Sequence, residues 1–557
     1  MKKTFIKTIA AAVLTVGLTG CVNDLDISSI DPQSSPNADP MGLLAKCYAT
    51  LGLTGQDGGA GNGDLSDDEG ESGFYRTTFN LQELPTDELM WAWQTDTDIP
   101  QITMMNWNSS SIRVQWAYTR LTYDITLFNN YLTTVADNEE NSRNRAEVRF
   151  LRALHYWYML DLFGKSPFKT EFNITELPVE YSGAELYDWL DKELTEIEPL
   201  MAEVGEYNNS ENFGRADRGA AYMLHARLAL NSEVYTKGAV RDYQKAIDYC
   251  DLLINSGAYD LARNEKSGNS GYAQLFMADN DRNSEAMQEI ILPIRQDGLR
   301  TRQYGGSVML IAGARSSQMP VYGMKETWTC LFAREALTKK FFPSLSDVPL
   351  ATEAADASLS QAEVAQLDEQ YGTTVADVIS RAGDDRALLY SGCANGVRKT
   401  GTDEISGFTD GLSPVKWTNL NSDNTAGSDP SWADTDIPLL RFAEAYLTRA
   451  EAKWRLSGNL NDALADINEL RGRAHTRLLA SITSEMDILD EWCREFFMEG
   501  RRRSDLVRFG CFAGSKYIWD WKGGVAEGTS VSSHYNVYPI PADDIRNNGN
   551  LSQNEGY

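Results

Sequence analysis

Apolar residues recur at helical spacing along the chain, in pairs of neighbouring segments. Residues 115–135 carry apolar side chains three or four positions apart, which predicts one apolar face along a long helix. These side chains are Tyr118, Leu121, Ile125, Phe128 and Leu132. Residues 143–163 complete this pair, and the same pattern predicts two further pairs. They are residues 216–235 with 242–256, and residues 437–456 with 460–474.

The second and third pairs resemble each other in detail. Residues 221–227 and 445–451 both place Tyr and Ala at matching positions, and each is followed by a second helical segment. This arrangement is typical of tetratricopeptide-like units, which stack because no unit can bury its apolar face alone. Generic antiparallel helix pairs fit the same pattern. We expect a mainly α fold with about four such pairs as a scaffold, mainly in residues 111–263 and 437–510.

The segments between the helical pairs lack this period. Residues 264–436 are rich in Gly and Asp, contain short strand-like runs such as residues 289–294, and are too long to be a plain loop. Together with residues 52–110, which include a Gly-rich and acidic loop, they predict an irregular subdomain packed on the scaffold. Binding residues concentrate on such segments.

The N-terminus has the pattern of an export signal. Lysines at positions 2, 3 and 7 precede an apolar run at residues 9–18 that is too short to span a bilayer, and Cys21 follows a small-residue cleavage site. This resembles a bacterial lipoprotein box, so residues 1–20 are expected to be removed and Cys21 lipidated. An ordinary signal peptide with an incidental Cys is the alternative. Acidic residues directly after Cys21 resemble a surface-export tag, which favours the cell exterior.

Charge and composition exclude several classes of function. With 80 Asp+Glu against 51 Lys+Arg, the net charge of −29 argues against nucleic acid as the main partner and against adhesion to anionic lipid by charge alone. Four scattered His make a zinc cluster or a His-based triad a poor hypothesis. No CxxC spacing occurs, and we expect no structural disulfide framework. A neutral or weakly charged ligand, or a protein partner, remains.

A series of short motifs makes the chain recognisable. Residues 434–444 lead into Arg449-Ala450-Glu451-Ala452, and residues 468–474, 499–510, 538–541 and 552–557 follow in order. Upstream, residues 149–154 and 254–259 fall at the expected places. Together these motifs resemble the RagB/SusD family of Bacteroidetes outer-membrane lipoproteins over essentially the whole mature chain, residues 21–557.

Several segments are closer still to starch-binding members of that family. They are residues 69–80, 91–94, 276–281 and 519–524. The resemblance implies a non-catalytic receptor, lipid-anchored in the outer membrane, that captures starch or maltooligosaccharides. It also implies a SusC-like TonB-dependent transporter as partner, with other surface glycan-binding lipoproteins and a surface amylase as further expected partners.

The same resemblance implies a set of glycan-binding residues. Trp93, Tyr304 and Trp328 would form an aromatic arc against a curved α-glucan, because aromatic rings cover the C–H faces of sugars. Asp68, Arg76 and Asp96 would address hydroxyl groups. The family carries Asn where this chain has Asp96, and an ionised carboxylate only accepts hydrogen bonds. Core packing is the alternative for any single Trp, and we assign Trp91 to the core.

Acidic residues on predicted loops suggest a calcium site. Asp281, Asp434 and Asp436 supply the hard oxygen ligands that Ca²⁺ prefers, and the family resemblance supports a structural ion. Solvated loop acids, or a helix cap at Asp436, are the alternative. No cofactor for catalysis is expected.

Three other functions are weighed against starch binding. The first is the same receptor role with a different glycan, since fold alone does not choose a ligand. The second is a glycoside hydrolase, which requires two positioned carboxylates. The third is a helical-repeat adaptor that binds only protein, which predicts that Trp93, Tyr304 and Trp328 are buried.

Overall fold

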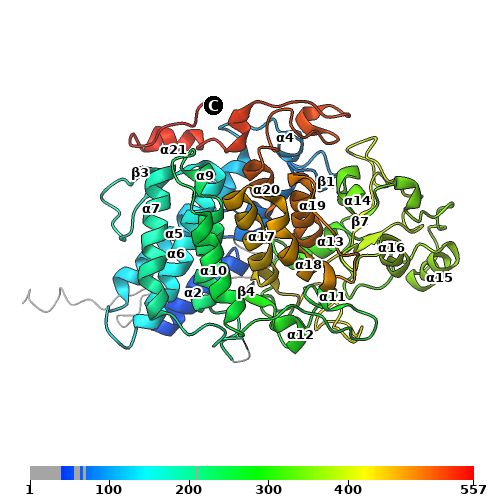
Figure 1. Cartoon of the computed structure of the whole chain (residues 1–557), viewed down its shortest axis with the longest axis horizontal. Helices are drawn as coiled ribbons and strands as arrows, with labels where there is room; N and C mark the ends of the chain where they lie inside the picture. Colours follow the sequence, from blue (N-terminus) through cyan, green and yellow to red (C-terminus); the bar gives the residue numbers. More distant parts are fainter. Residues whose placement is uncertain (1–38, 56–62, 67–69, 209–210) are drawn as a thin grey trace, which may run out of the picture.

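A computed structural model describes residues 39–55, 63–66, 70–208 and 211–557, and its architecture is mainly helical. The longest helices fill one side and the centre of the molecule, whereas shorter helices, short strands and loops form the opposite end (Figure 1). The longer helices are α2 (Pro40–Gly52), α3 (Phe74–Glu83), α5 (Ile112–Thr134), α6 (Ser142–Phe163), α7 (Gly183–Ile197), α8 (Arg218–Leu230), α10 (Tyr243–Asn255), α15 (Gln361–Tyr371), α16 (Val375–Ala382), α17 (Ala443–Ser457), α18 (Leu464–Arg473) and α19 (Glu485–Phe496).

The remaining elements are short. The short helices are α4 (Ile99–Thr103), α9 (Ser232–Tyr235), α11 (Gly271–Gln274), α12 (Ser284–Met287), α13 (Ser307–Gly313), α14 (Glu335–Phe341), α20 (Arg502–Arg508) and α21 (Ala542–Asn547). The strands are β1 (Leu89–Trp91), β2 (Lys165–Phe168), β3 (Val179–Ser182), β4 (Ile290–Ile294), β5 (Leu331–Ala333), β6 (Leu389–Tyr390), β7 (Ser413–Pro414) and β8 (Ile437–Arg441). They form antiparallel two-stranded ladders in the order β1-β5, β2-β3, β4-β8 and β6-β7.

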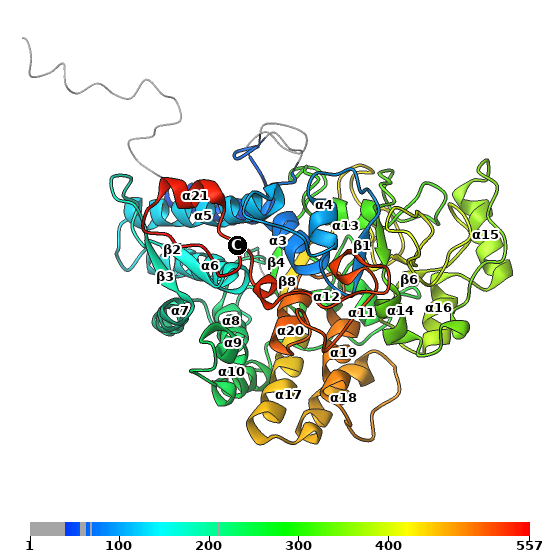
Figure 2. The same cartoon turned by 90° about the horizontal axis from the view of Figure 1, so that it is seen from above.

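The predicted helix pairs form the scaffold. In α5, the apolar face expected from the sequence is buried at Tyr118, Leu121, Ile125 and Phe128, and α6 packs along it. The second pair corresponds to α8 and α10, and α10 also packs against α17 of the third pair. The pairs therefore lie side by side, as Figure 2 shows from above. Such stacking buries the apolar faces that single pairs would expose.

The prediction of a helix over residues 437–456 is wrong at its first turn. Ile437–Arg441 is strand β8, paired antiparallel with β4, and α17 begins only at Ala443. All five residues of β8 are buried, and a short continuous apolar run is typical of a fully buried strand as well as of a helix. The strand expected at residues 289–294 is confirmed as β4.

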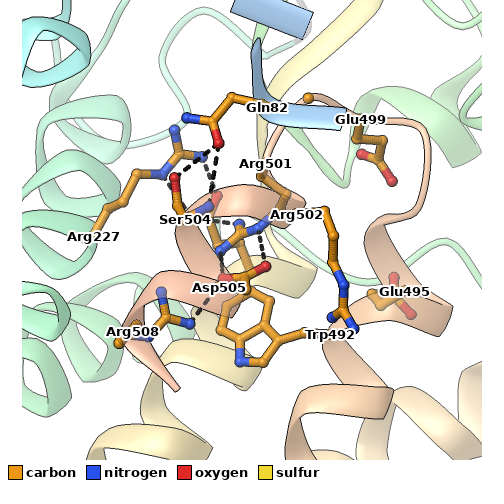
Figure 3. A network of polar contacts seen from close by, with 12 residues as sticks. Gln82, Arg227, Trp492, Glu495, Glu499, Arg501, Arg502, Ser504, Asp505 and Arg508 are labelled. Atoms are coloured by element: carbon orange, nitrogen blue, oxygen red, sulfur yellow. Dashed lines mark hydrogen bonds and ion pairs between the residues drawn. The ribbon is translucent and has the colours of Figure 1, made fainter. Parts of the chain in front are cut away.

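In the arginine run 501–503, Arg501 is half-buried and the other two side chains are buried. Arg502 and Arg503 are each 1% exposed, and Arg502 forms a bidentate pair with Asp87 at 2.7 and 2.8 Å. Figure 3 shows Arg501 and Arg508 converging on Asp505 within α20. Buried charges persist only when they are paired, and this network holds α20 against the interior.

The same motif fixes α3. The backbone amides of Gly500 and Arg501 donate to the Glu83 carboxylate at 2.6 and 3.0 Å, at the C-terminal end of α3. The C-terminal part of the chain therefore positions the helix whose first turn carries Arg76.

The expected signal peptide and Cys21 lie outside the described residues. Within the ranges that the structure describes, no helix is both long and apolar enough to cross a membrane. Six cysteines lie in these ranges, and all are buried with free thiols. Cys250 and Cys493 lie inside α10 and α19, as expected for small core residues.

Candidate functional site

The β1-β5 ladder brings Trp93 and Trp328 together. Trp91 pairs with Leu331, and the Ala92 amide donates to the Cys330 carbonyl at 2.7 Å. In an antiparallel pair, the residues just beyond one strand lie beside those just before the other. Trp93 follows β1 and Trp328 precedes β5, so their ring centroids are 6.4 Å apart with planes at 39°.

Trp328 is held in place by α13. Its backbone amide donates to the Ala312 carbonyl at 2.8 Å, and the Cys330 amide donates to the Gly313 carbonyl at 2.8 Å. Between them, Thr329 has a φ of 50°, a conformation that β-branched residues rarely adopt. Its hydroxyl donates to the Arg315 carbonyl at 2.9 Å. Backbone strain of this kind costs about 1–3 kcal/mol and persists where surrounding contacts impose it.

Tyr304 joins the two tryptophans from the loop before α13. Its ring centroid lies 5.9 Å from that of Trp328, with planes at 55°. The neighbouring Gly305 lies so close to Gly70 that a Cβ on Gly305 would be 2.2 Å from the Gly70 carbonyl oxygen. Only glycine permits this approach. The segment that leads into α3 is thereby packed against the loop that carries Tyr304.

Sequence reasoning missed a fourth ring. Trp432, in the loop before β8, has its centroid 4.7 Å from that of Tyr304 with planes at 41°. No periodic pattern marks it, and the one available signal was an aromatic residue on a predicted polar loop. We call the set Trp93, Trp328, Tyr304 and Trp432 the aromatic arc. All four side chains are half-buried, so each is packed on one side and reaches solvent on another.

Arg76 lies against the arc from the first turn of α3. It is buried, and its guanidinium lies 5.7 Å from the Trp328 ring centroid and 5.9 Å from that of Trp91. Glu71, which sequence reasoning also missed, pairs with Arg76 at 2.6 Å and with Arg113 at 3.0 Å. Burial lowers the pKa of Arg76 and the Glu71 carboxylate opposes that shift, so the guanidinium remains charged at neutral pH. Among the residues that the structure describes, none forms a hydrogen bond with its buried Nε.

Asp96 lies beside the arc and anchors Trp91. The Trp91 indole N–H donates to the Asp96 carboxylate at 3.0 Å, and Trp91 is 1% exposed, which confirms it as a core residue. Its ring meets that of Trp93 edge to face, at 6.1 Å and 89°. Asp68, the remaining predicted site residue, lies outside the described residues. The structure thus brings together Arg76, Trp93, Asp96, Tyr304 and Trp328, and their contact with a ligand stays a prediction.

The three carboxylates predicted to bind calcium do not converge. The Arg295 guanidinium lies between Asp281, at 2.9 Å, and Asp436, at 3.1 Å. Asp434 instead accepts hydrogen bonds from the Gly298 amide and the Ser428 hydroxyl at 2.8 and 2.7 Å. Among the described residues, no group of three or more His, Cys, Asp or Glu side chains is arranged to hold a metal ion.

This arrangement does not fit a calcium ion unless Arg295 moves away, because its guanidinium lies between the Asp281 and Asp436 carboxylates. Calcium at this place stays a prediction. The helix-cap alternative for Asp436 is wrong, since the strand β8 follows it.

The comparisons with known proteins agree with these observations. A sequence profile described as the SusD family matches residues 366–557. The chain is 54% identical over 570 residues to the starch-binding protein SusD of Bacteroides thetaiotaomicron, covering 100% of both chains. It is similar to the crystal structure of a SusD-like protein of Bacteroides fragilis, with a TM-score of 0.64 and 19% identity over 93% of this chain and 96% of that one.

A second solved structure widens the range of ligands on this fold. Surface glycan-binding protein A of Bacteroides thetaiotaomicron, in complex with laminarihexaose, matches with a TM-score of 0.60 and 17% identity. The match covers 92% of this chain and 98% of that one. At such identities the likeness concerns the fold alone.

Proposed function

The chain belongs to the SusD family, and from this membership we propose that it is a cell-surface receptor that binds starch and maltooligosaccharides. The observation that carries the proposal is the aromatic arc. Its rings come from segments that span more than 300 positions of the sequence, from Trp93 to Trp432, yet they form one contiguous row of half-buried aromatic side chains.

The chemistry of the arc suits an α-glucan. Each ring offers an apolar face to the C–H face of a glucose unit, and neighbouring planes are tilted by 39–55° rather than parallel. A row of tilted rings favours a ligand that curves, such as amylose or a cyclodextrin. The buried Arg76 Nε, the Glu71 carboxylate and the Asp96 carboxylate add hydrogen-bonding groups beside the rings. The half-buried state of Trp93, Tyr304 and Trp328 also disfavours the adaptor alternative, which required them to be buried.

Binding without catalysis is part of the proposal. Glycoside hydrolysis requires one carboxyl group to donate a proton and a second to attack or activate water. Near the arc, Glu71 is paired with Arg76 and Arg113, and Asp96 accepts the Trp91 indole N–H. Both carboxylates are therefore engaged in holding other site residues, a role that suits a receptor.

We extend the proposal to the protein's place in the cell. The lipoprotein box at Cys21 would anchor the chain in the outer membrane, facing outward, and a SusC-like TonB-dependent transporter would receive the captured glycan. Other surface glycan-binding lipoproteins and a surface amylase are the remaining proposed partners. Family membership and the N-terminal sequence support these assignments.

Calorimetric titration tests the receptor function. The mature chain from residue 22 is titrated with α-cyclodextrin and maltoheptaose, beside Trp328→Ala and the control Trp454→Ala, a half-buried Trp on α17. We expect wild type and the control to bind both sugars, and Trp328→Ala to lose about 10- to 100-fold in affinity, as truncation of a central aromatic contact does. Equal binding by Trp328→Ala would contradict the placement of the site. Wild type that binds neither sugar, but binds another glycan, would support the alternative ligand.

A further inference from the structure

We infer that Trp432 forms an additional glucose subsite at the Tyr304 end of the arc, which makes the receptor selective for longer α-glucan chains. This inference rests on the proposed function, because it assigns a length preference to the same site. The resemblance that identified Trp93, Tyr304 and Trp328 did not include Trp432, and its assignment comes from its position in the structure.

Trp432 continues the geometry of the other three rings. The ring centroids of Tyr304 and Trp432 are 4.7 Å apart, and the angle between their planes is 41°. This angle is similar to the 39° between the planes of Trp93 and Trp328. Trp432 lies at the opposite end of the row from Trp93. A ligand that covers three rings leaves one terminal ring uncovered, whereas a longer ligand reaches both terminal rings.

The loop that carries Trp432 is ordered by its own hydrogen bonds. The Asp429 carboxylate accepts from the amides of Ser431 and Trp432 at 2.7 and 3.2 Å. The Lys325 amide, three residues before Trp328, donates to the Pro430 carbonyl at 2.7 Å. The loop is thus tied to the segment that carries the central tryptophan of the arc.

A close backbone contact ties the same loop to the turn at Gly298, between β4 and Tyr304. A Cβ on Gly298 would lie 2.7 Å from the Trp432 carbonyl oxygen, so glycine permits the two segments to touch. The Asp434 carboxylate reinforces this contact by accepting a hydrogen bond from the Gly298 amide at 2.8 Å. The Trp432 backbone is therefore fixed on both sides before a ligand arrives, and a preformed ring binds without the entropy cost of ordering a loop.

A purely structural role for Trp432 makes a different prediction. If it served only to support Tyr304, its removal would weaken the binding of every ligand that contacts Tyr304 by the same factor. An additional subsite instead predicts a loss that grows with ligand length, since a short chain can still bind across the other three rings whereas a longer chain needs both ends of the row. Comparing the affinity loss for short and long ligands therefore distinguishes the two roles, and this comparison does not depend on the stability of the variant.

The test is calorimetric titration of wild type, Trp432→Ala and Trp432→Phe with maltotriose and maltoheptaose. We expect Trp432→Ala to lose about 5- to 10-fold in affinity for maltoheptaose, which corresponds to about 1–1.4 kcal/mol, and less than about twofold for maltotriose. Trp432→Phe keeps a ring and should retain most of the maltoheptaose affinity. Melting temperatures of the three proteins check that each is folded.

The outcomes separate this inference from the receptor function. An equal loss for both sugars, or no loss for either, overturns the additional subsite while leaving α-glucan binding in place. Wild type that binds neither sugar overturns both. Trp328→Ala, measured in parallel, should bind both sugars more weakly than wild type, because Trp328 lies within the row rather than at its end.

Discussion

Trp91 and Trp93 are two positions apart on one extended segment, but their environments give them different roles. The Trp91 indole is 1% exposed and needs an acceptor for its N–H, which Asp96 supplies at 3.0 Å. The Trp93 ring packs edge to face against the Trp91 ring and remains half-buried. Asp96 is thus a support for the arc as well as a candidate sugar contact. An amide at this position could accept the same N–H through its carbonyl oxygen and still offer its NH₂ group to a sugar.

The first prediction follows from this contact. Asp96→Ala removes the acceptor of a buried indole N–H and should lower the free energy of unfolding by about 1–2 kcal/mol, with weaker maltoheptaose binding because Trp93 loses its support. Asp96→Asn should keep wild-type stability and bind at least as tightly. Urea denaturation and calorimetry of both variants measure the two effects. An Asp96→Ala protein as stable as wild type would show that this hydrogen bond does not hold Trp91.

The sequence predicted the residues of the arc only where a family resemblance named them. Trp432 and Glu71 carried no comparable signal, because their roles depend on contacts made in the folded chain. Trp432 contacts Tyr304, which lies 128 positions earlier in the sequence. Glu71 contributes to the site through its ion pairs with Arg76 and Arg113. The position of the Arg76 guanidinium beside the Trp91 and Trp328 rings could not be predicted from the sequence either. It depends on how α3 packs against the β1-β5 ladder in the folded chain.

At the scale of elements, local periodicity predicted the helices well and the site-forming segments poorly. The apolar face of α5 repeats over many turns, so the helix can be predicted without knowing which helix packs against it. Strand β8 is five residues long, and its partner β4 lies well over one hundred positions upstream. The ladder β1-β5, which sets Trp93 beside Trp328, has three residues per strand. Segments this short take their structure from tertiary contacts.

The second prediction concerns the close contact between two of these segments. Gly305→Ala would place a methyl group 2.2 Å from the Gly70 carbonyl oxygen, so the loop that carries Tyr304 must move away from the start of α3. We expect a loss of about 1–3 kcal/mol in stability from overpacking, and loss of α-cyclodextrin binding because Tyr304 is displaced. Gly549→Ala, with no atom within 4 Å of the new Cβ, is the matched control. Thermal denaturation and calorimetry that find Gly305→Ala equal to this control would refute the role of the contact.

At the scale of the whole molecule, a strongly acidic chain keeps part of its negative charge inside, paired with arginine. Glu491 on α19 is buried and pairs with Arg386, Arg471 and Arg494 at 2.8, 2.8 and 2.9 Å. Burial raises the pKa of this carboxyl group, but the three guanidinium groups outweigh burial and lower its pKa to about 2. The Arg386–Glu491 pair connects α19 to the segment that leads into β6, because Arg386 lies three residues before that strand. This junction between α19 and the segment before β6 is therefore held by charge pairs whose strength depends on pH.

The last prediction is the acid sensitivity of this junction. Because the pKa of Glu491 is lower in the folded state than its ordinary value of 4.5, the stabilisation is complete above about pH 4.5 and is lost as the pH falls toward 2. A carboxyl group held ionised in this way contributes on the order of a few kcal/mol to stability at neutral pH. Glu491→Gln cannot ionise, so its deficit relative to wild type should be full at pH 7 and shrink steadily below pH 4.5. Urea denaturation at pH 7, 4 and 3 measures the deficit, with the exposed Glu176→Gln as control. A deficit that stays constant over this range would mean that Glu491 is not held ionised by its arginines, and that the junction depends on packing instead.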